Sequence, residues 1–250
     1  MNLVQAVFLG LFQGLTEFLP VSSSGHLVIG QRLFGLLDPP VLFDILVHIG
    51  TLISIIIFFN KKIFGFYKDK KNWILIIVGS IPAALLGFIL NSYIEVLFNS
   101  LKLVGLALLV TAGLLFLTKR WEKRNKDKER PLSSKNAFII GLFQALAIIP
   151  GVSRSGSTIS AGLFQGINRK KAFDFSFFLG APAMLGALCL QLPDMMVKKQ
   201  EFYFGLIGLV IASIVGFLAL KILRQVVLKA QLWYFSFYCF ILGLLLLVFS

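Results

Sequence analysis

The chain has 250 residues, of which 58% are hydrophobic and only 14% are charged, and its mean hydropathy is +0.89. About a quarter of the residues of an average soluble domain are charged, so this composition excludes a disordered chain and argues against an ordinary soluble enzyme. The formal net charge is +13, but the basic residues lie between apolar runs, which argues against a nucleic-acid partner. Cys189 and Cys239 both lie within apolar runs, which disfavours a disulfide or a metal site.

Six apolar segments are long enough to cross a membrane as helices. A spanning helix needs about 20 predominantly apolar residues. The sequence predicts full spans over 42–60, 73–91, 103–118, 173–193, 203–220 and 231–249. The predicted fold class is therefore an all-α polytopic membrane protein.

The distribution of Lys and Arg orients these spans. Of the 24 Lys and Arg residues, 19 lie in segments 61–72, 119–135, 169–171 and 221–229. Because cytoplasmic loops of membrane proteins are enriched in Lys and Arg, we place these four segments on the cytoplasmic side.

Residues 10–26 and 141–157 form an internal repeat. GLFQGLTEFLPVSSSGH aligns without gaps with GLFQALAIIPGVSRSGS at an offset of 131 residues, and nine of the 17 positions are identical. We therefore divide a single integral-membrane domain into repeat one (1–118), a basic cytoplasmic linker (119–135) and repeat two (136–250).

Each repeat opens with two segments that are too short to span. As a helix, residues 136–149 rise only about 21 Å, against a hydrocarbon core of ~30 Å, and residues 155–168 are equally short. Basic segments flank this pair on both sides, so the pair is predicted to be a re-entrant hairpin with its tip at 150–156. The repeat predicts a matching hairpin over 1–36 that enters from the opposite side. Two inverted repeats whose tips meet near the middle of the membrane are typical of transporter-like folds.

Charged groups at membrane depth are costly and usually functional. Three of them, Glu17, His26 and Arg154, lie in the repeated motifs. Each lies at a position where the two repeats differ: Glu17 aligns with Ile148, His26 with Ser157, and Arg154 with Ser23. A carboxylate, an imidazole and a guanidinium placed in this way predict one asymmetric site.

The tips also predict an anion site. Each Ser-rich turn opens a helix, whose N-terminal amides favour an anion, and the planar guanidinium of Arg154 suits phosphate oxygens. The expected phosphate-binding residues are Arg154, Ser22, Ser153, Ser155, Gly156 and Thr158. The alternative for the serines, Ser24 and Ser155 above all, is helix capping or interhelical hydrogen bonding.

His26 is a candidate base or nucleophile, and Ser23 is an alternative nucleophile. Glu17 follows Gln13 by one helical turn, so the two share a helix face. That face could hold a divalent cation, Mg²⁺ or Ca²⁺, or Glu17 could orient His26.

Three further polar groups receive structural interpretations. Asp44 and His48 are predicted to form a polar pair, because they lie four residues apart on one helix. Asp174 is predicted to cap its helix or to pair with Lys170 or Lys171.

Two long motifs carry a family resemblance. The first reads Gln13-Gly-Leu-Thr-Glu17 and continues as Phe18-Leu-Pro-Val-Ser-Ser-Ser-Gly-His26; the second reads Pro150-Gly-Val-Ser-Arg-Ser-Gly156. With these motifs the whole chain resembles the undecaprenyl-diphosphate phosphatases of the bacitracin-resistance (BacA/UppP) family. Some members have Glu where this chain has Gln13, which leaves one carboxylate here for a metal.

The resemblance implies hydrolysis of undecaprenyl diphosphate to undecaprenyl phosphate and inorganic phosphate. This reaction recycles the lipid carrier for peptidoglycan and other envelope polymers, and it confers bacitracin resistance. The resemblance also implies interdigitated inverted repeats, a divalent cation, a homodimer in the bacterial inner membrane and a site open to the periplasmic side. By motif position, Glu17, His26 and Arg154 are the essential residues, with Ser22 and Ser23 close by.

The expected function is therefore an integral-membrane diphosphatase acting on a polyprenyl diphosphate. A transporter or flippase of polyprenyl phosphate or another anion is the alternative, because inverted repeats that meet at a polar site are also expected of carriers. A lipid-binding structural subunit ranks last, because it would not need the three charged or titratable groups.

Overall fold

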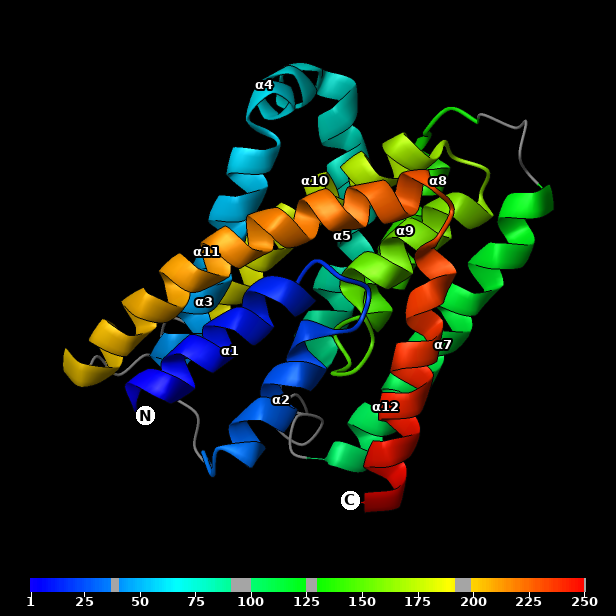
Figure 1. The fold of residues 1–250 in the computed structure, drawn as a ribbon. Coiled ribbons are helices and arrows are strands. Elements are labelled where there is room, and N and C mark those ends of the chain that lie inside the picture. Colours follow the sequence, from blue (N-terminus) through cyan, green and yellow to red (C-terminus); the bar gives the residue numbers. More distant parts are fainter. Residues whose placement is uncertain (37–40, 91–99, 125–129, 192–198, 250) are drawn as a thin grey trace.

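The computed structural model describes residues 1–36, 41–90, 100–124, 130–191 and 199–249. Within these ranges the regular structure is helical, apart from one isolated bridge between Arg130 and Ile167 (Figure 1). In chain order the helices are α1 (Leu3–Thr16), α2 (Ser23–Leu33), α3 (Val41–Phe58), α4 (Asn60–Lys68), α5 (Lys70–Leu90), α7 (Leu101–Arg124), α8 (Ser134–Leu146), α9 (Arg154–Phe164), α10 (Arg169–Gln191), α11 (Lys199–Leu228), the 3₁₀ turn η3 (Leu232–Tyr234) and α12 (Phe235–Phe249).

Six helical segments in the described part of the chain are long and apolar enough to cross a membrane. They are α3, α5, α7, α10, α11 and the segment formed by η3 and α12. The six predicted spans are confirmed, but several of their boundaries differ from the prediction, most of all the C-terminal ends of α7 and α11. Helix α7 continues to Arg124 and α11 to Leu228. Lys and Arg are good helix formers, so basic residues that follow an apolar run extend the helix instead of ending it.

The segment 61–72, treated as a loop in the sequence interpretation, contains α4. Ile63, Phe66 and Tyr67 pack against the main hydrophobic core, while Lys61 and Lys68 are exposed. This helical spacing of apolar and basic side chains explains why the segment folds as an amphipathic helix. The predicted linker is also partly helical, since α7 occupies its start; linker residues 125–129 lie outside the described residues.

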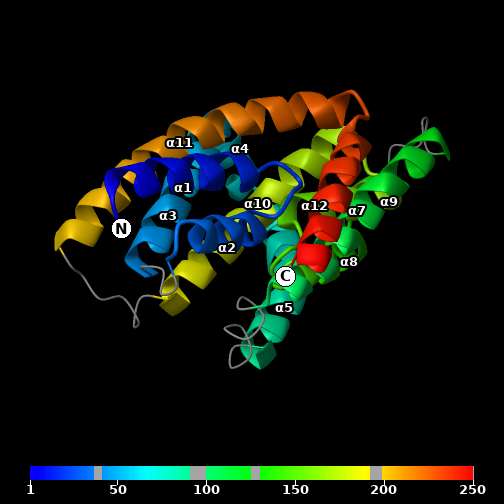
Figure 2. The ribbon, with the colours of Figure 1, turned by 60° about the horizontal axis from the view of Figure 1, so that its bottom comes forward.

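Helices α1, α2, α8 and α9 have 14, 11, 13 and 11 residues, which is short of a membrane span, as the sequence predicts. Two of these short helices, α1 and α8, each pack against one long helix of the other half of the chain. Helix α1 packs against α11, and the two run alongside each other in both ribbon views (Figure 1, Figure 2), whereas α8 packs against α5. Glycines allow the close approach: a Cβ on Gly10 would lie 3.0 Å from the carbonyl oxygen of Gly208, and one on Gly141 would collide with Gly79. Small residues at helix crossings are the usual means of such packing in membranes.

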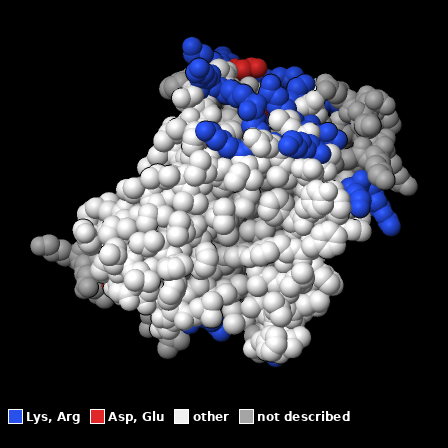
Figure 3. Space-filling view, viewed as in Figure 1, with Lys and Arg blue, Asp and Glu red and all other residues white. Residues whose placement is uncertain are grey.

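A large aromatic cluster lies between α3 and α10. The rings of Phe59 and Phe173, with centroids 5.9 Å apart, are both fully buried, and Phe177 and Phe178 extend the cluster along α10. Lys and Arg gather at one end of the molecule, over α4 and the C-terminal end of α11 (Figure 3). The rest of the visible surface is almost free of charged residues, as a lipid-facing surface requires.

Candidate active site

The two Ser-rich turns meet inside the helical bundle. The first turn joins α1 to α2, and the second joins α8 to α9. The backbone N–H of Gly151 donates to the Ser22 hydroxyl at 3.0 Å, which links the turns directly. Thr111 of α7 supports the second turn, because its hydroxyl donates to the Gly151 carbonyl oxygen at 2.9 Å and accepts from the Ser153 N–H at 3.0 Å.

A serine caps the helix after each turn. The Ser22 hydroxyl accepts from the N–H of Gly25 at 3.4 Å, and the Ser153 hydroxyl accepts from the N–H of Gly156 at 3.1 Å. The caps are thus Ser22 and Ser153. The hydroxyls of Ser24 and Ser155, for which the sequence interpretation favoured helix capping or interhelical hydrogen bonding, lie 3.2 and 3.3 Å from those of the capping serines.

Glu17 lies at the centre of a buried polar network. Its Oε1 accepts from Nη2 of Arg154 at 2.6 Å, which forms an ion pair between the two turns. Its Oε2 accepts from the Ser23 hydroxyl at 2.6 Å and from the Gln13 side-chain amide at 3.1 Å. The structure therefore brings together four of the predicted site residues from both repeated motifs.

The guanidinium of Arg154 is not saturated by these contacts. Its Nη1 is buried and has no hydrogen-bond partner among the described residues. The group is packed against the backbone of Gly180, where any side chain would collide with it, and Nη2 also lies 3.0 Å from the Met184 sulfur. A buried donor without a partner is costly, so Nη1 is a natural partner for an oxygen of an anionic ligand.

His26 is held apart from this network. Its Nδ1 lies 2.8 Å from the Ser22 carbonyl oxygen, which can only accept, so Nδ1 carries the proton. Its Nε2 lies 2.6 Å from the Tyr238 hydroxyl of α12, and the two rings are stacked with centroids 5.6 Å apart. No hydrogen bond joins His26 to Glu17 in the described part of the chain, so Ser22 and Tyr238, rather than Glu17, orient the imidazole.

Two other predicted site residues are buried. The Thr158 hydroxyl donates to the Arg154 carbonyl oxygen at 2.8 Å and lies 2.6 Å from the Ser176 hydroxyl of α10, so it joins two helices. Ser155 is 1% exposed and contacts the capping Ser153.

The remaining polar groups differ from the sequence interpretation in their partners. The Asp44 carboxylate accepts twice from the Gln31 side chain, at 3.0 and 3.2 Å, and among the described residues the hydrogen bond of His48 goes to the Asp44 carbonyl oxygen, at 2.7 Å. The prediction that Asp174 caps its helix or pairs with Lys170 or Lys171 is wrong. Asp174 forms an ion pair with Lys62 at 2.6 Å, because its face of α10 packs against the start of α4, which the sequence interpretation treated as a loop.

The described residues contain no group of three or more His, Cys, Asp or Glu side chains that could hold a metal ion. Gln13 Oε1 is buried without a hydrogen-bond partner among the described residues, whereas the Gln13 amide nitrogen donates to Glu17 and both Glu17 oxygens accept hydrogen bonds. Mg²⁺ is commonly bound by one or two carboxylates together with substrate phosphates. Gln13 and Glu17 are the residues here that would contribute oxygens to a divalent cation shared with a phosphate ligand.

Several residues at the site lie outside the motifs. Thr111, Met184 and Tyr238 come from helices that sequence analysis describes only as apolar spans. Gly180 had one sequence signal, because the repeat extends downstream of the aligned motifs: Phe43-Asp44 and Gly50 correspond to Phe173-Asp174 and Gly180.

Comparison with known proteins places the chain in a family. The model of the family described as bacitracin resistance protein BacA matches residues 6–245. The chain belongs to this family. It is 40% identical over 255 residues to a protein of Halothermothrix orenii named undecaprenyl-diphosphatase, and the alignment covers 99% of this chain and 98% of that one. Proteins of the same name from Desulforapulum autotrophicum and Carboxydothermus hydrogenoformans are each 42% identical, with 99% of this chain and 98% and 97% of theirs covered.

Proposed function

We propose that the protein is an integral-membrane hydrolase that converts undecaprenyl diphosphate to undecaprenyl phosphate and inorganic phosphate. The reaction recycles the lipid carrier of peptidoglycan and envelope synthesis and confers bacitracin resistance. One observation carries the proposal: a buried Glu17–Arg154 pair, 2.6 Å apart, joins the two Ser-rich turns in a chain whose relatives are named undecaprenyl-diphosphatase.

Arg154 is the proposed phosphate-binding group. Its unpaired Nη1 and the N-terminal amides of α9 can bind and neutralise phosphate oxygens. The hydroxyls of Ser22, Ser153, Ser155 and Thr158, with the backbone of Gly156, hold the two turns and α9 in position around this group, and the polyprenyl tail would lie between the apolar helices.

Ser23 and His26 are the two candidate nucleophiles. The hydrogen bond from Ser23 to Glu17 favours Ser23, because a carboxylate at 2.6 Å can accept the hydroxyl proton. In this scheme the Ser23 oxygen bonds to the terminal phosphorus while the bridging P–O bond breaks and undecaprenyl phosphate departs. Water then hydrolyses the phosphoserine and releases phosphate. His26, with an unprotonated Nε2 beside Tyr238, is placed to move protons in the second step.

A divalent cation, Mg²⁺ or Ca²⁺, is part of the proposal. Glu17 and Gln13 would hold it together with the substrate, and the cation would neutralise charge on the diphosphate. The free Gln13 Oε1 supports this assignment.

We also propose the inverted-repeat architecture, with repeat one at 1–118, repeat two at 136–250 and two re-entrant hairpins. The reciprocal packing of α1 on α11 and of α8 on α5 supports an arrangement in which each hairpin packs against the other repeat. The direct bond between the turns, from Gly151 to Ser22, supports tips that meet. A homodimer in the bacterial inner membrane, with the site open to the periplasmic side, completes the proposal and rests on the family resemblance.

The test is phosphate release from a polyprenyl diphosphate by purified protein in detergent micelles. The wild type should release phosphate, and Arg154→Ala should lower the rate at least about 10²-fold, the usual cost of one transition-state donor. Glu17→Ala should have a comparable effect. Lys68→Ala, which removes an exposed cation outside the site, is the control, and melting curves of all variants separate inactivity from misfolding.

Micelles have no compartments, so this assay also separates the diphosphatase from a transporter. A folded wild type that releases no phosphate, but moves the lipid across a vesicle membrane, would support the transporter. Wild-type rates in both site variants would refute the assigned site.

A further inference from the structure

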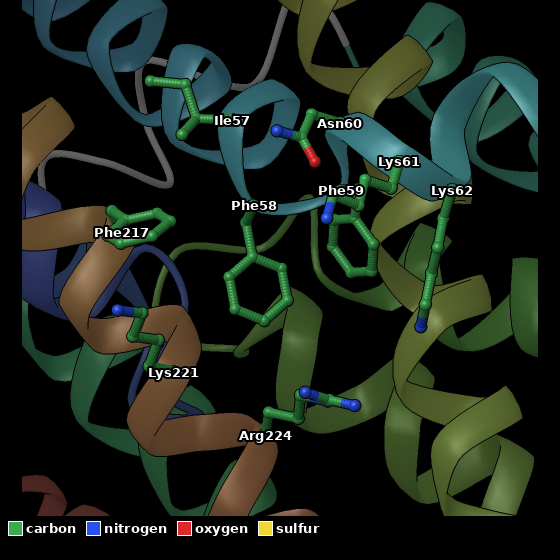
Figure 4. A pocket seen from close by; sticks show the side chains of 9 residues that line it. All are labelled: Ile57, Phe58, Phe59, Asn60, Lys61, Lys62, Phe217, Lys221 and Arg224. Carbon is green, nitrogen blue, oxygen red and sulfur yellow. The ribbon is translucent and has the colours of Figure 1, made fainter.

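A second polar feature lies away from the Glu17–Arg154 network, at the basic end of the molecule. It is a cleft of about 310 Å³ between the junction of α3 and α4 and the C-terminal part of α11 (Figure 4). Four cations line it: Lys61, Lys62, Lys221 and Arg224. We call it the α4–α11 cleft.

The bottom of the α4–α11 cleft is an aromatic row. Phe58 lies between Phe217 and Phe59, with ring centroids 6.1 and 4.9 Å from theirs. A cation stands over each end of the row, since Lys221 is 4.5 Å from the Phe217 centroid and Lys62 is 5.8 Å from that of Phe59. Figure 4 shows the four basic side chains around this row; Lys61 and Lys221 are exposed, and Lys62 forms an ion pair with Asp174.

The positive charge of this cleft is largely uncompensated. No carboxylate lines it, and of its four cations only Lys62 forms an ion pair among the described residues, with Asp174. A neighbouring cleft of about 520 Å³ differs, because Asp69 and Asp174 line it together with its basic residues. Like charges gathered around a partly buried cleft repel one another, so an anion bound between them is favoured.

We propose that the α4–α11 cleft binds the phosphate group of an anionic membrane lipid. The planar guanidinium of Arg224 suits phosphate oxygens, and basic pockets between membrane helices on the cytoplasmic side are typical sites for anionic headgroups. The excess of Lys and Arg at this end places it at the cytoplasmic surface.

The surroundings favour a lipid over free phosphate. Ile57 lines the cleft and is 51% exposed, and Ile214 and Leu218, two turns and one turn before Lys221 on α11, are 60% and 52% exposed. These apolar side chains continue the cleft toward the membrane core, where the acyl chains of a bound lipid would lie. A free phosphate ion would use only the cations.

The experiment measures phosphatidylglycerol retained by purified protein in mixed micelles, by native mass spectrometry, with phosphatidylcholine as the reference lipid. The wild type should retain phosphatidylglycerol in preference to phosphatidylcholine. Lys221→Gln/Arg224→Gln should reduce its retention at least fivefold. The matched control is Lys68→Gln/Lys229→Gln, which removes two exposed cations from the same end of the molecule outside the cleft, and it should change retention less than twofold.

Three results would overturn the proposal. Unchanged retention in the cleft variant would show that the cations do not bind lipid, and an equal loss in the control would show an effect of overall charge. Displacement of phosphatidylglycerol by an equal concentration of inorganic phosphate would assign the cleft to free phosphate.

If the double variant fails to fold, the single variant Lys221→Gln replaces it. This variant should still lower the retention of phosphatidylglycerol, by about half as much on a logarithmic scale. Because binding is measured without turnover, its outcome is independent of whether the protein hydrolyses a diphosphate.

Discussion

The turn before α2 and the turn before α9 have the same scaffold. In each, a serine caps the helix by accepting from the glycine N–H three residues later, and a second serine hydroxyl lies 3.2 or 3.3 Å from the cap. These serines and glycines are the positions at which the repeated motifs agree.

The positions at which the motifs differ carry the charged groups. Arg154 of the second turn takes the place of Ser23 in the first, and both contact Glu17, whose counterpart is Ile148. The shared residues therefore set the backbone of the turns, and the divergent residues supply the chemistry that one site needs. Variants at the two kinds of position should separate stability from activity.

The largest effect on activity is expected from Arg154→Ser, which gives the second turn the residue that the first turn has at Ser23. Arg154→Ser removes the guanidinium but keeps the capping Ser153, so phosphate release should fall at least about 10²-fold. Glu17 would then be buried without its cation, which costs about 3–5 kcal/mol of stability. The double variant Glu17→Gln/Arg154→Ser should regain part of this stability while staying inactive. A double variant that melts no higher than the single one would contradict the role of the pair.

A smaller effect is expected from Gly180→Ala, which changes no polar group. The new methyl would collide with the Arg154 guanidinium, so the side chain must move away from Glu17. Phosphate release should fall about 10-fold or more, since small displacements of catalytic groups are costly. Gly186→Ala on the same helix is the matched control, because no atom lies within 4 Å of its added methyl. Equal activity of the two variants would show that Gly180 does not position Arg154.

Tyr238→Phe tests the role of His26, another residue at which the two motifs differ. The change removes the hydroxyl that contacts His26 Nε2 and keeps the stacked ring, so the imidazole loses one of its two hydrogen-bond partners. We expect a decrease in kcat of about threefold to tenfold, because one neutral hydrogen bond is worth about 0.5–1.5 kcal/mol. Tyr234→Phe, at a similarly exposed tyrosine, should leave kcat unchanged. A changed KM with constant kcat would assign Tyr238 to substrate binding.

The sequence predicts the spans and the central contact well, for physical reasons. Long apolar runs leave few alternatives to membrane helices, and the Gln13–Glu17 contact follows from the helical period. The repeat analysis predicts that the two Ser-rich turns meet, and the Glu17–Arg154 ion pair joins the segments at these turns.

Side-chain contacts between helices that are distant in the sequence were not predictable. The contact between Lys62 and Asp174 requires α4, and a short amphipathic helix among lysines is easily taken for a loop. Tyr238 reaches His26 from a helix that is apolar throughout, and its sequence neighbourhood carries no signal for that contact. The sequence alone did not single out the capping serines, because each turn offers more than one serine, and only the backbone geometry, including φ of 70° at Ser22, selects the cap.

The smallest effect on activity is expected at the positions where the two motifs agree. Ser153→Ala tests whether this serine is a helix cap or a phosphate ligand. Its hydroxyl is 1% exposed and already accepts from Gly156, so its loss should cost about 1 kcal/mol of stability, as loss of a helix cap does. The KM for the diphosphate should stay within twofold, measured well below the melting temperature. Ser133→Ala removes the corresponding cap of α8, outside the turns, and should destabilise the protein by a similar amount. A tenfold rise in KM for Ser153→Ala alone would instead make Ser153 a phosphate ligand, and the shared positions of the two turns would then carry chemistry as well as structure.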